Sequence, residues 1–268
     1  MYELEYVRKR KRRIIVAIAG GVSAVVISTF AIVAFLGRFV GTFTVSLETR
    51  NVDIALSEKI SAKRSSFLKV DCGAPFQEFT YSDFDKRYGD EVIDNEESDY
   101  TLGANYSIVD PTEIESFNFF KYTFYVQNVG STPAKFDFSL MINEDVKSSD
   151  GRSLLDTLRV MVYNDGEKTV YGKPESKPHY GEDGIADYRA PISVNEYDAT
   201  ESNPFMGYAE PFISNKAITT ISSQTISVGE ARRFTVVSWL EGFRSNNDQV
   251  APKGATIKLG VEINAYEN

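Results

Sequence analysis

The sequence predicts an all-β protein: an antiparallel β-sandwich of the jelly-roll or Ig-like kind, exported behind one N-terminal transmembrane helix. Three observations support this prediction. Residues 14–37 form an apolar run of 24 residues without a charged side chain. Residues 38–268 contain several segments in which apolar and polar side chains alternate, the pattern of strands with one buried face. Cysteine occurs only once, at Cys72, so the exported part cannot depend on an internal disulfide.

The apolar run is long enough to span a bilayer. A helix rises about 1.5 Å per residue, so a helix over this run reaches about 36 Å and crosses a hydrocarbon core of about 30 Å. The flank before the run carries six basic and two acidic side chains, and Lys and Arg stay on the cytoplasmic side. We therefore expect a cytoplasmic basic tail at 1–13, a signal-anchor helix at 14–37 and an extracellular domain at 38–268.

A cleaved signal peptide, with secretion as the outcome, is the alternative for this segment. Apolar regions of signal peptides are usually about 7–15 residues long and are followed by small residues at positions −3 and −1. The run here is longer, and cleavage after Gly37 or Gly41 would place Phe35 or Phe39 at −3. The sequence therefore favours an uncleaved anchor in the cell membrane.

The exported part is acidic. The chain has 29 basic and 38 acidic side chains, and removing the six basic and two acidic ones of residues 1–37 leaves a net charge of −13 on residues 38–268. A protein of this sign is repelled by phosphate backbones. We expect contact with the lipid bilayer through residues 14–37, protein partners or self-association at the cell surface, and no nucleic acid.

Alternating segments and turn signals give the order of the elements. Strands are expected at Phe43–Leu47, Val52–Leu56, Phe120–Val126, Phe136–Ile142 and Ile257–Ile263. Asn128–Pro133 is typical of a hairpin or of a corner between two sheets. Asp165-Gly166 between two apolar runs predicts a tight hairpin. Residues 152–158 predict a short helix with Leu154, Leu155 and Leu158 on one side.

Two stretches lack periodicity and are expected to be surface insertions, at about 83–100 and 172–211. The second holds five of the nine prolines and is long enough for a short hairpin or a binding surface. The first is rich in acidic residues, and calcium takes many oxygen ligands. The calcium candidates are Asp83, Asp85, Asp90 and Glu91. An EF-hand is excluded because Arg87 stands at the fifth position from Asp83, and a solvated acidic loop is the favoured interpretation.

Three patches of sequence carry a resemblance to a known family. They comprise Gly41–Leu47 with Asn51–Glu58, then Tyr122–Ser131 with Pro133–Phe138, and finally Val236–Phe243. In this order they resemble the TasA/camelysin-like group of exported Firmicute surface proteins. The resemblance implies a jelly-roll-like sandwich and a matrix or fibre role. The chain departs from the group in its poor cleavage site. An anchor that is not cleaved would not release a fibre subunit.

No catalytic residue or cofactor site is predicted. Camelysin-like proteins include a described metallopeptidase, but the single histidine, His179, cannot supply a His-rich zinc site or a convincing catalytic triad. Cys72 has no histidine near it in sequence, so packing is favoured over nucleophilic chemistry. Trp239 beside Glu241 is a candidate ligand-binding aromatic, with core packing as the favoured interpretation.

The sequence therefore predicts a membrane-anchored, cell-surface structural or interaction protein. Two alternatives remain open at this stage. One is an exported hydrolase that relies on carboxylates alone, which would need two carboxylates about 5–10 Å apart in one cleft. The other is an exported ligand-binding domain.

Overall fold

In a computed structural model, the described residues are 38–39, 41–72, 78–79, 81, 106–109, 116–180, 184–195, 205–241, 252 and 254–267. The chain divides into two compact units, Met1–Leu36 and Gly37–Asn268, and all described residues belong to the second. The predicted tail 1–13 and anchor 14–37 lie outside the described residues. Within the described ranges, no helix is both long enough and apolar enough to cross a bilayer.

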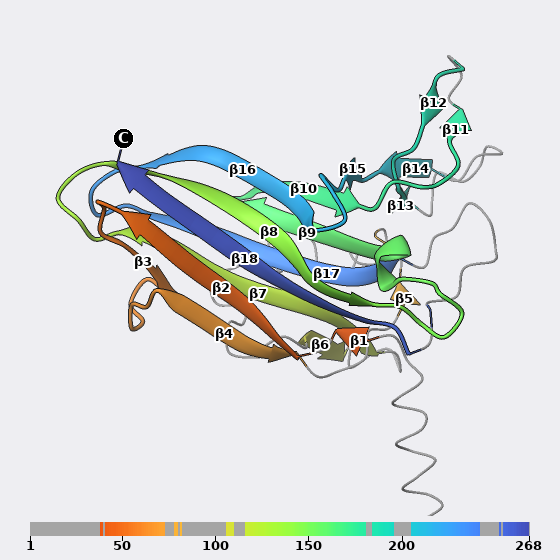
Figure 1. Cartoon of the computed structure of the whole chain (residues 1–268), viewed down its shortest axis with the longest axis horizontal. Coiled ribbons are helices and arrows are strands. Elements are labelled where there is room, and N and C mark those ends of the chain that lie inside the picture. The colour runs from red at the N-terminus through yellow and green to blue at the C-terminus, as the bar shows by residue number, and fades with distance from the viewer. Residues whose placement is uncertain are drawn as a thin grey trace, which may run out of the picture. The chain divides into compact units, whose positions relative to one another are not determined.

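The described part of the chain is all-β, as the sequence predicts, and its strands form two large sheets (Figure 1). The smaller sheet has six described strands, ordered β16-β8-β18-β2-β4 with β1 beside β18. These strands are β1 (Arg38–Phe39), β2 (Gly41–Arg50), β4 (Phe67–Cys72), β8 (Ala134–Val146), β16 (Ala217–Ile226) and β18 (Thr256–Glu267).

The larger sheet has eight described strands, ordered β15-β10-β9-β17-β7-β3, with β5 beside β17 and β6 beside β7. These strands are β3 (Ile54–Ser57), β5 (Glu78–Phe79), β6 (Tyr106–Val109), β7 (Ser116–Asn128), β9 (Leu158–Asn164), β10 (Glu167–Gly172), β15 (Glu210–Pro211) and β17 (Ala231–Glu241). All five predicted strand segments lie within or overlap these elements.

The sheets are mixed, which differs from the predicted antiparallel arrangement. Most neighbours are antiparallel, but β2 runs parallel to β18, with Thr44 opposite Gly260 and Arg50 opposite Tyr266. The pairs β1 with β18, β10 with β15 and β5 with β17 are parallel as well. Alternation within one strand reports which face is buried but not the direction of the neighbouring strand, so this feature could not be read from the pattern.

The main core lies between the two sheets. On β8 every second residue from Ala134 to Ile142 is buried, as expected for a strand with one face inward. Phe138 on this strand stacks on Phe234 of β17, with ring centroids 4.7 Å apart. Phe43 of β2 contacts Phe120 of β7 at 4.8 Å. Each pair joins one sheet to the other, so the inner faces share one aromatic-rich core.

The larger sheet is also buried on its outer face, which corrects the expectation of one buried and one wet face. Lys121 and Thr123 are polar residues that alternate with the apolar ones of the predicted strand Phe120–Val126, and both are buried, as is Gln127 of β7. A second apolar cluster lies on this face and includes Trp239 of β17. Its other members are Tyr81, Phe119, Met161, Tyr163, Ala190, Ile192, Ala209 and Val237.

Two predicted turns have the conformations that their residues favour. Asp165 and Gly166 both have positive φ, at 51° and 91°, and they connect β9 to β10 with Asn164 opposite Glu167. Such a two-residue turn matches the twist of its strands. At the Asn128–Pro133 turn the chain passes from the larger sheet to the smaller one, so this turn is a corner. The Asn128 side chain accepts from Gly130 N at 3.0 Å and donates to Thr132 O at 2.8 Å.

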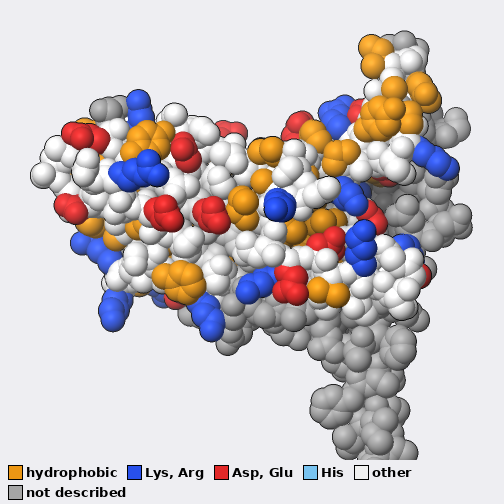
Figure 2. Space-filling view, viewed as in Figure 1, with side chains coloured by type: hydrophobic (Ala, Val, Ile, Leu, Met, Phe, Trp, Pro, Cys, Tyr) orange, Lys and Arg blue, Asp and Glu red, His pale blue; other side chains and the backbone are white. Residues whose placement is uncertain are grey.

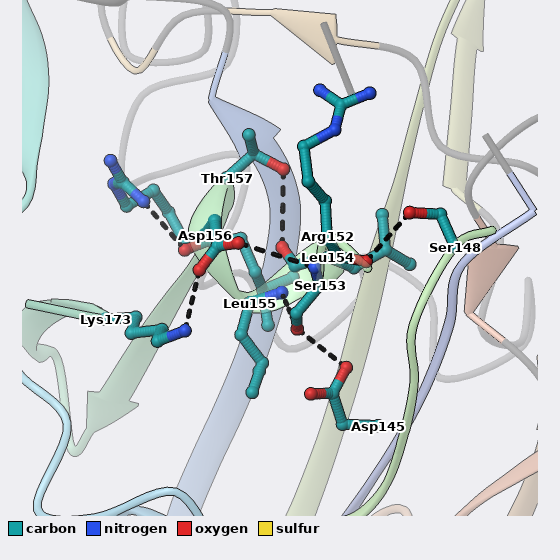
Figure 3. Close-up of polar contacts among 11 residues, drawn as sticks. Asp145, Ser148, Arg152, Ser153, Leu154, Leu155, Asp156, Thr157 and Lys173 are labelled. Atoms are coloured by element: carbon teal, nitrogen blue, oxygen red, sulfur yellow. Dashed lines mark hydrogen bonds and ion pairs between the residues drawn. The ribbon is translucent and has the colours of Figure 1, made fainter. Parts of the chain in front are cut away.

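The predicted helix at 152–158 is a single 3-10 turn, η1 (Leu154–Asp156), between β8 and β9. Figure 3 shows its capping box: Ser153 Oγ accepts from Leu155 N at 3.0 Å, and Asp156 accepts from Ser153 N at 3.4 Å. Ser153 Oγ also donates to Asp145 Oδ1 at 2.6 Å. Leu154 and Leu155 are buried in the main core. The capping box satisfies N–H groups at the start of the turn, which lies where the chain passes from β8 of the smaller sheet to β9 of the larger one.

Phe234 gives a direct test of the shared core. Its ring contacts Phe124 of its own sheet at 5.7 Å and Phe136 and Phe138 of the other sheet at 6.0 and 4.7 Å. We expect Phe234→Ala to lower the free energy of unfolding by about 3–5 kcal/mol, because it leaves a cavity between the sheets. Urea unfolding followed by the fluorescence of Trp239, the single tryptophan, measures this. The exposed control Val228→Ala should change it by less than about 0.5 kcal/mol.

Candidate functional site

A cluster of polar side chains is enclosed on the outer face of the larger sheet. It comprises Tyr81, Arg159, Trp239 and Glu241, and we refer to it as the Arg159–Glu241 cluster. Arg159 of β9 lies directly opposite Trp239 of β17, and Glu241 follows two residues later on the same face of β17. Arg159 is 3% exposed, Glu241 1% and Trp239 0%. Charged side chains are rarely enclosed to this extent without specific partners.

Glu241 holds two neighbouring groups through its carboxylate. Trp239 Nε1 donates to Glu241 Oε2 at 3.1 Å. The backbone N–H of Tyr81 lies between the two carboxylate oxygens, at 3.3 and 3.2 Å. The Tyr81 ring also stacks on the Trp239 ring, with centroids 6.0 Å apart. This carboxylate therefore fixes Tyr81 to the face of the sheet.

Arg159 holds a different segment. Its Nε and Nη2 both donate to Pro191 O, at 3.2 and 3.0 Å, and its Nη1 donates to Leu158 O at 2.9 Å. Burial lowers the pKa of the Arg159 guanidinium, while attraction to the Glu241 and Glu175 carboxylates acts in the opposite direction. The buried positive charge of Arg159 and the buried negative charge of Glu241 thus offset each other.

Pro191 belongs to the segment 172–211, which we call the arm. Its described residues form β11 (His179–Tyr180), β12 (Ala186–Asp187), β13 (Pro191–Asn195) and β14 (Phe205–Tyr208), paired as two small antiparallel sheets, and β15 at its end. The arm leaves the larger sheet after β10 and returns through β15, which pairs with β10. Ala209 N donates to Ala190 O at 2.9 Å, and Phe212 N donates to Gly172 O at 3.1 Å.

The arm meets the larger sheet at Gly172, Ala190, Pro191 and Ala209, and we call these residues the arm root. The root packs closely on the sheet at Gly172. A Cβ at this position would lie 2.7 Å from the Cβ of Ala190 and 3.1 Å from the Cβ of Ala209. These contacts are with the first atoms of short side chains, which cannot rotate away. Gly172 is therefore required for the close approach, and together with Arg159 it fixes the position of the arm root on the sheet.

The far end of the arm is exposed. Tyr180, Ile185 and Tyr188 are 68%, 67% and 49% exposed, and we call these three residues the tip. Glu175 N donates to Tyr188 O at 2.8 Å, which ties the tip hairpin back to the first part of the arm. Figure 1 shows β11 and β12 away from both large sheets, and Figure 2 shows apolar side chains gathered on this part of the molecule.

One ion pair of the arm lies beside the tip residue Tyr188. Arg189 Nη2 and Asp187 Oδ2 are 2.8 Å apart, and this hydrogen-bonded pair raises the pKa of Arg189. The Arg189 guanidinium also lies over the Tyr208 ring, 5.0 Å from its centroid. Burial and the nearby Asp187 charge raise the pKa of Tyr208. The arm thus combines tyrosine rings with a cation stacked on one of them.

The residues singled out from the sequence have different outcomes. Trp239 is a packing residue, as favoured, and its indole also donates to Glu241. The backbones of His179 and Cys72 lie in β11 and β4, while their side chains are outside the described part. The calcium candidates Asp83, Asp85, Asp90 and Glu91 also lie outside it. Across the described ranges, no group of three or more His, Cys, Asp or Glu side chains is placed to hold a metal ion.

The sequence analysis missed Arg159 and the covered outer face. A signal was present in two continuous apolar runs, Val160–Tyr163 and Val236–Val237 with Trp239–Leu240. Such runs are typical of strands buried on both faces. A charged residue next to such a run then lies where water is excluded. Nothing in the sequence pattern identifies Pro191 as the partner of Arg159, because the two residues are 32 positions apart and no repeating pattern relates them.

A double-mutant cycle tests the coupling between the buried charges of Arg159 and Glu241. Arg159→Leu leaves the Glu241 carboxylate buried without its compensating charge, and we expect a loss of about 3–5 kcal/mol in the free energy of unfolding. Arg159→Leu/Glu241→Leu removes both charges, so its loss in the free energy of unfolding should be smaller than the sum of the two single losses. Urea unfolding of both single variants and the double variant measures the coupling. Additive single losses would contradict a buried charge pair.

Adding a side chain at Gly172 should loosen the arm root locally. Gly172→Ala should separate Ala190 from β10 and increase amide hydrogen exchange at Ala209 and Phe212, whose N–H groups bond across the root. Gly172→Ala/Ala190→Gly removes the shortest of the contacts and should restore part of the protection. Unchanged exchange in Gly172→Ala would show that the root does not need this glycine.

Comparisons with known proteins do not assign the chain to a family. No family model matches it, and no curated protein matches it. Among solved structures, it is similar to a β-glucosidase from Kluyveromyces marxianus in complex with glucose, with 14% identity and a TM-score of 0.19 over 59% of this chain and 13% of that chain. It is also similar to AvmM, which catalyzes macrocyclization in alchivemycin A biosynthesis, with 10% identity and a TM-score of 0.20 over 60% of this chain and 86% of that chain. The chain thus spans only a small part of the β-glucosidase, and at these TM-scores neither neighbour bears on its function.

Proposed function

We propose that the protein is a cell-surface interaction protein, anchored by residues 14–37, that presents a β-sandwich of the jelly-roll or Ig-like kind and acts by contact. The observation that carries this proposal is the arm. Its root is fixed on the larger sheet by Arg159 and by close packing at Gly172, whereas its tip exposes two tyrosines and an isoleucine. A fixed root lowers the entropy lost when the tip engages a partner.

Composition and sequence patterning support the anchor and its direction. The six basic side chains before residue 14 and the acidic character of residues 38–268 fit a cytoplasmic N-terminus and an exported domain. The resemblance to the TasA/camelysin-like group adds a matrix or fibre role to the proposal. Self-association and binding of a different surface protein are both contact functions, and both require the arm to face the outside of the cell.

Labelling of single cysteines tests the proposed orientation. In a Cys72→Ser background, Tyr180→Cys should react with a membrane-impermeant maleimide on intact cells that express the chain, because its side chain is exposed and proposed to lie outside. Lys9→Cys should react only after the membrane is permeabilised. Labelling of both positions, or of neither, on intact cells would overturn the proposed orientation. The intact mass of the cell-associated and released protein then distinguishes an anchored form from one shed after cleavage.

A further inference from the structure

The tip lies within one of the two acidic stretches of residues 38–268. Residues 172–211 carry eight acidic and three basic side chains, and residues 83–100 carry eight acidic and two basic ones. These two stretches account for −11 of the net charge of −13 on residues 38–268. The rest of the exported part is almost balanced in charge. The negative charge therefore belongs to the two insertions rather than to the sheets.

Tyr81 and the arm are held on the same face of the larger sheet. Tyr81 N donates to Glu241, and Pro191 O of the arm accepts from Arg159. Arg159 and Glu241 belong to adjacent strands and attract each other. Tyr81 and Pro191 are therefore held by neighbouring side chains of the sheet.

Tyrosine rings in this region already accept cations from the chain itself. The Arg189 guanidinium lies over Tyr208 at 5.0 Å, and Lys168 Nζ lies over Tyr81 at 5.6 Å. Both distances are within the range in which a cation is attracted to the face of an aromatic ring. At the tip, Tyr180 and Tyr188 offer the same chemistry, and both are about half exposed or more.

We propose that the tip binds a basic polypeptide, whose Lys or Arg side chains stack on Tyr180 and Tyr188 within the negative field of the arm. The inference rests on the proposed function and names the class of partner. Charge complementarity favours such a partner over a second copy of this chain, because two acidic arms repel each other. A neutral glycan is the alternative occupant that the experiment must exclude. It would stack on the same two rings without a contribution from charge.

Binding of a defined peptide to the purified full chain in a non-ionic detergent tests the proposal. The probe is a fluorescein-labelled peptide of six Arg-Gly repeats, and the matched probe has six Gln-Gly repeats. Fluorescence anisotropy should show binding of the Arg-Gly peptide only, with an affinity that falls as NaCl is raised from 50 to 200 mM. Equal binding of both peptides, or binding that does not change with salt, would overturn the proposal.

Variants at the tip identify the surface. Tyr180→Ser/Tyr188→Ser should weaken binding of the Arg-Gly peptide about tenfold, whereas Tyr180→Phe/Tyr188→Phe, which keeps both rings, should bind as the parent chain does. The control Ile60→Ser/Val228→Ser removes apolar residues of comparable exposure, 57% and 51%, far from the tip in sequence, and should leave the affinity within about twofold. Urea unfolding followed by Trp239 fluorescence establishes that each variant is folded.

Two outcomes would separate the inference from the proposed function. Unchanged peptide binding in the tip variant, or displacement of the peptide by a neutral hexasaccharide in excess, would overturn the basic partner while leaving the orientation of the arm as found by cysteine labelling. Failure of the labelling would overturn the cell-surface proposal, whereas the binding measured on purified protein would stand or fail independently.

Discussion

The structure depends on the burial of both faces of strand β17. Phe234 on one face packs between the two sheets, and Trp239 on the other face lies under the arm root and Tyr81. A two-layer protein would leave the second face in water, where a tryptophan and its apolar neighbours lose the free energy of burial. A third layer is therefore needed, and in the described part of the chain it is supplied by Tyr81 and by the arm, whose short strands β13 and β14 pair with each other.

The third layer explains why charged groups are enclosed. Short covering segments leave some backbone groups without partners in a sheet, and these groups need other donors and acceptors when they are buried. Arg159 donates to Pro191 O, and Glu241 accepts from Tyr81 N. An apolar side chain at either position could pack but could not satisfy these groups. The two charges are thus retained for their hydrogen bonds, and each reduces the cost of burying the other.

Much of the fold follows from the sequence, but little of the site does. The alternation in Phe136–Ile142 and Phe120–Val126 identifies strands because one period describes one strand, and Asp165-Gly166 identifies its hairpin because few residues adopt positive φ. The parallel pairing of β2 with β18 cannot be predicted from such local patterns, because it joins residues more than 200 positions apart. The burial of Lys121 could not be predicted from the alternation around it, because burial depends on what covers a face and a period of two cannot report that.

The parallel pairing of β2 with β18 has a mechanical consequence. The chain enters β2 at one end of this pair and leaves β18 at the other, with seven residue pairs in register from Thr44–Gly260 to Arg50–Tyr266. Tension applied before β2 and after β18 therefore acts along the strands, and the hydrogen bonds between them must slide together rather than open one after another. A domain pulled in this direction resists extension more strongly than one whose terminal strands peel apart.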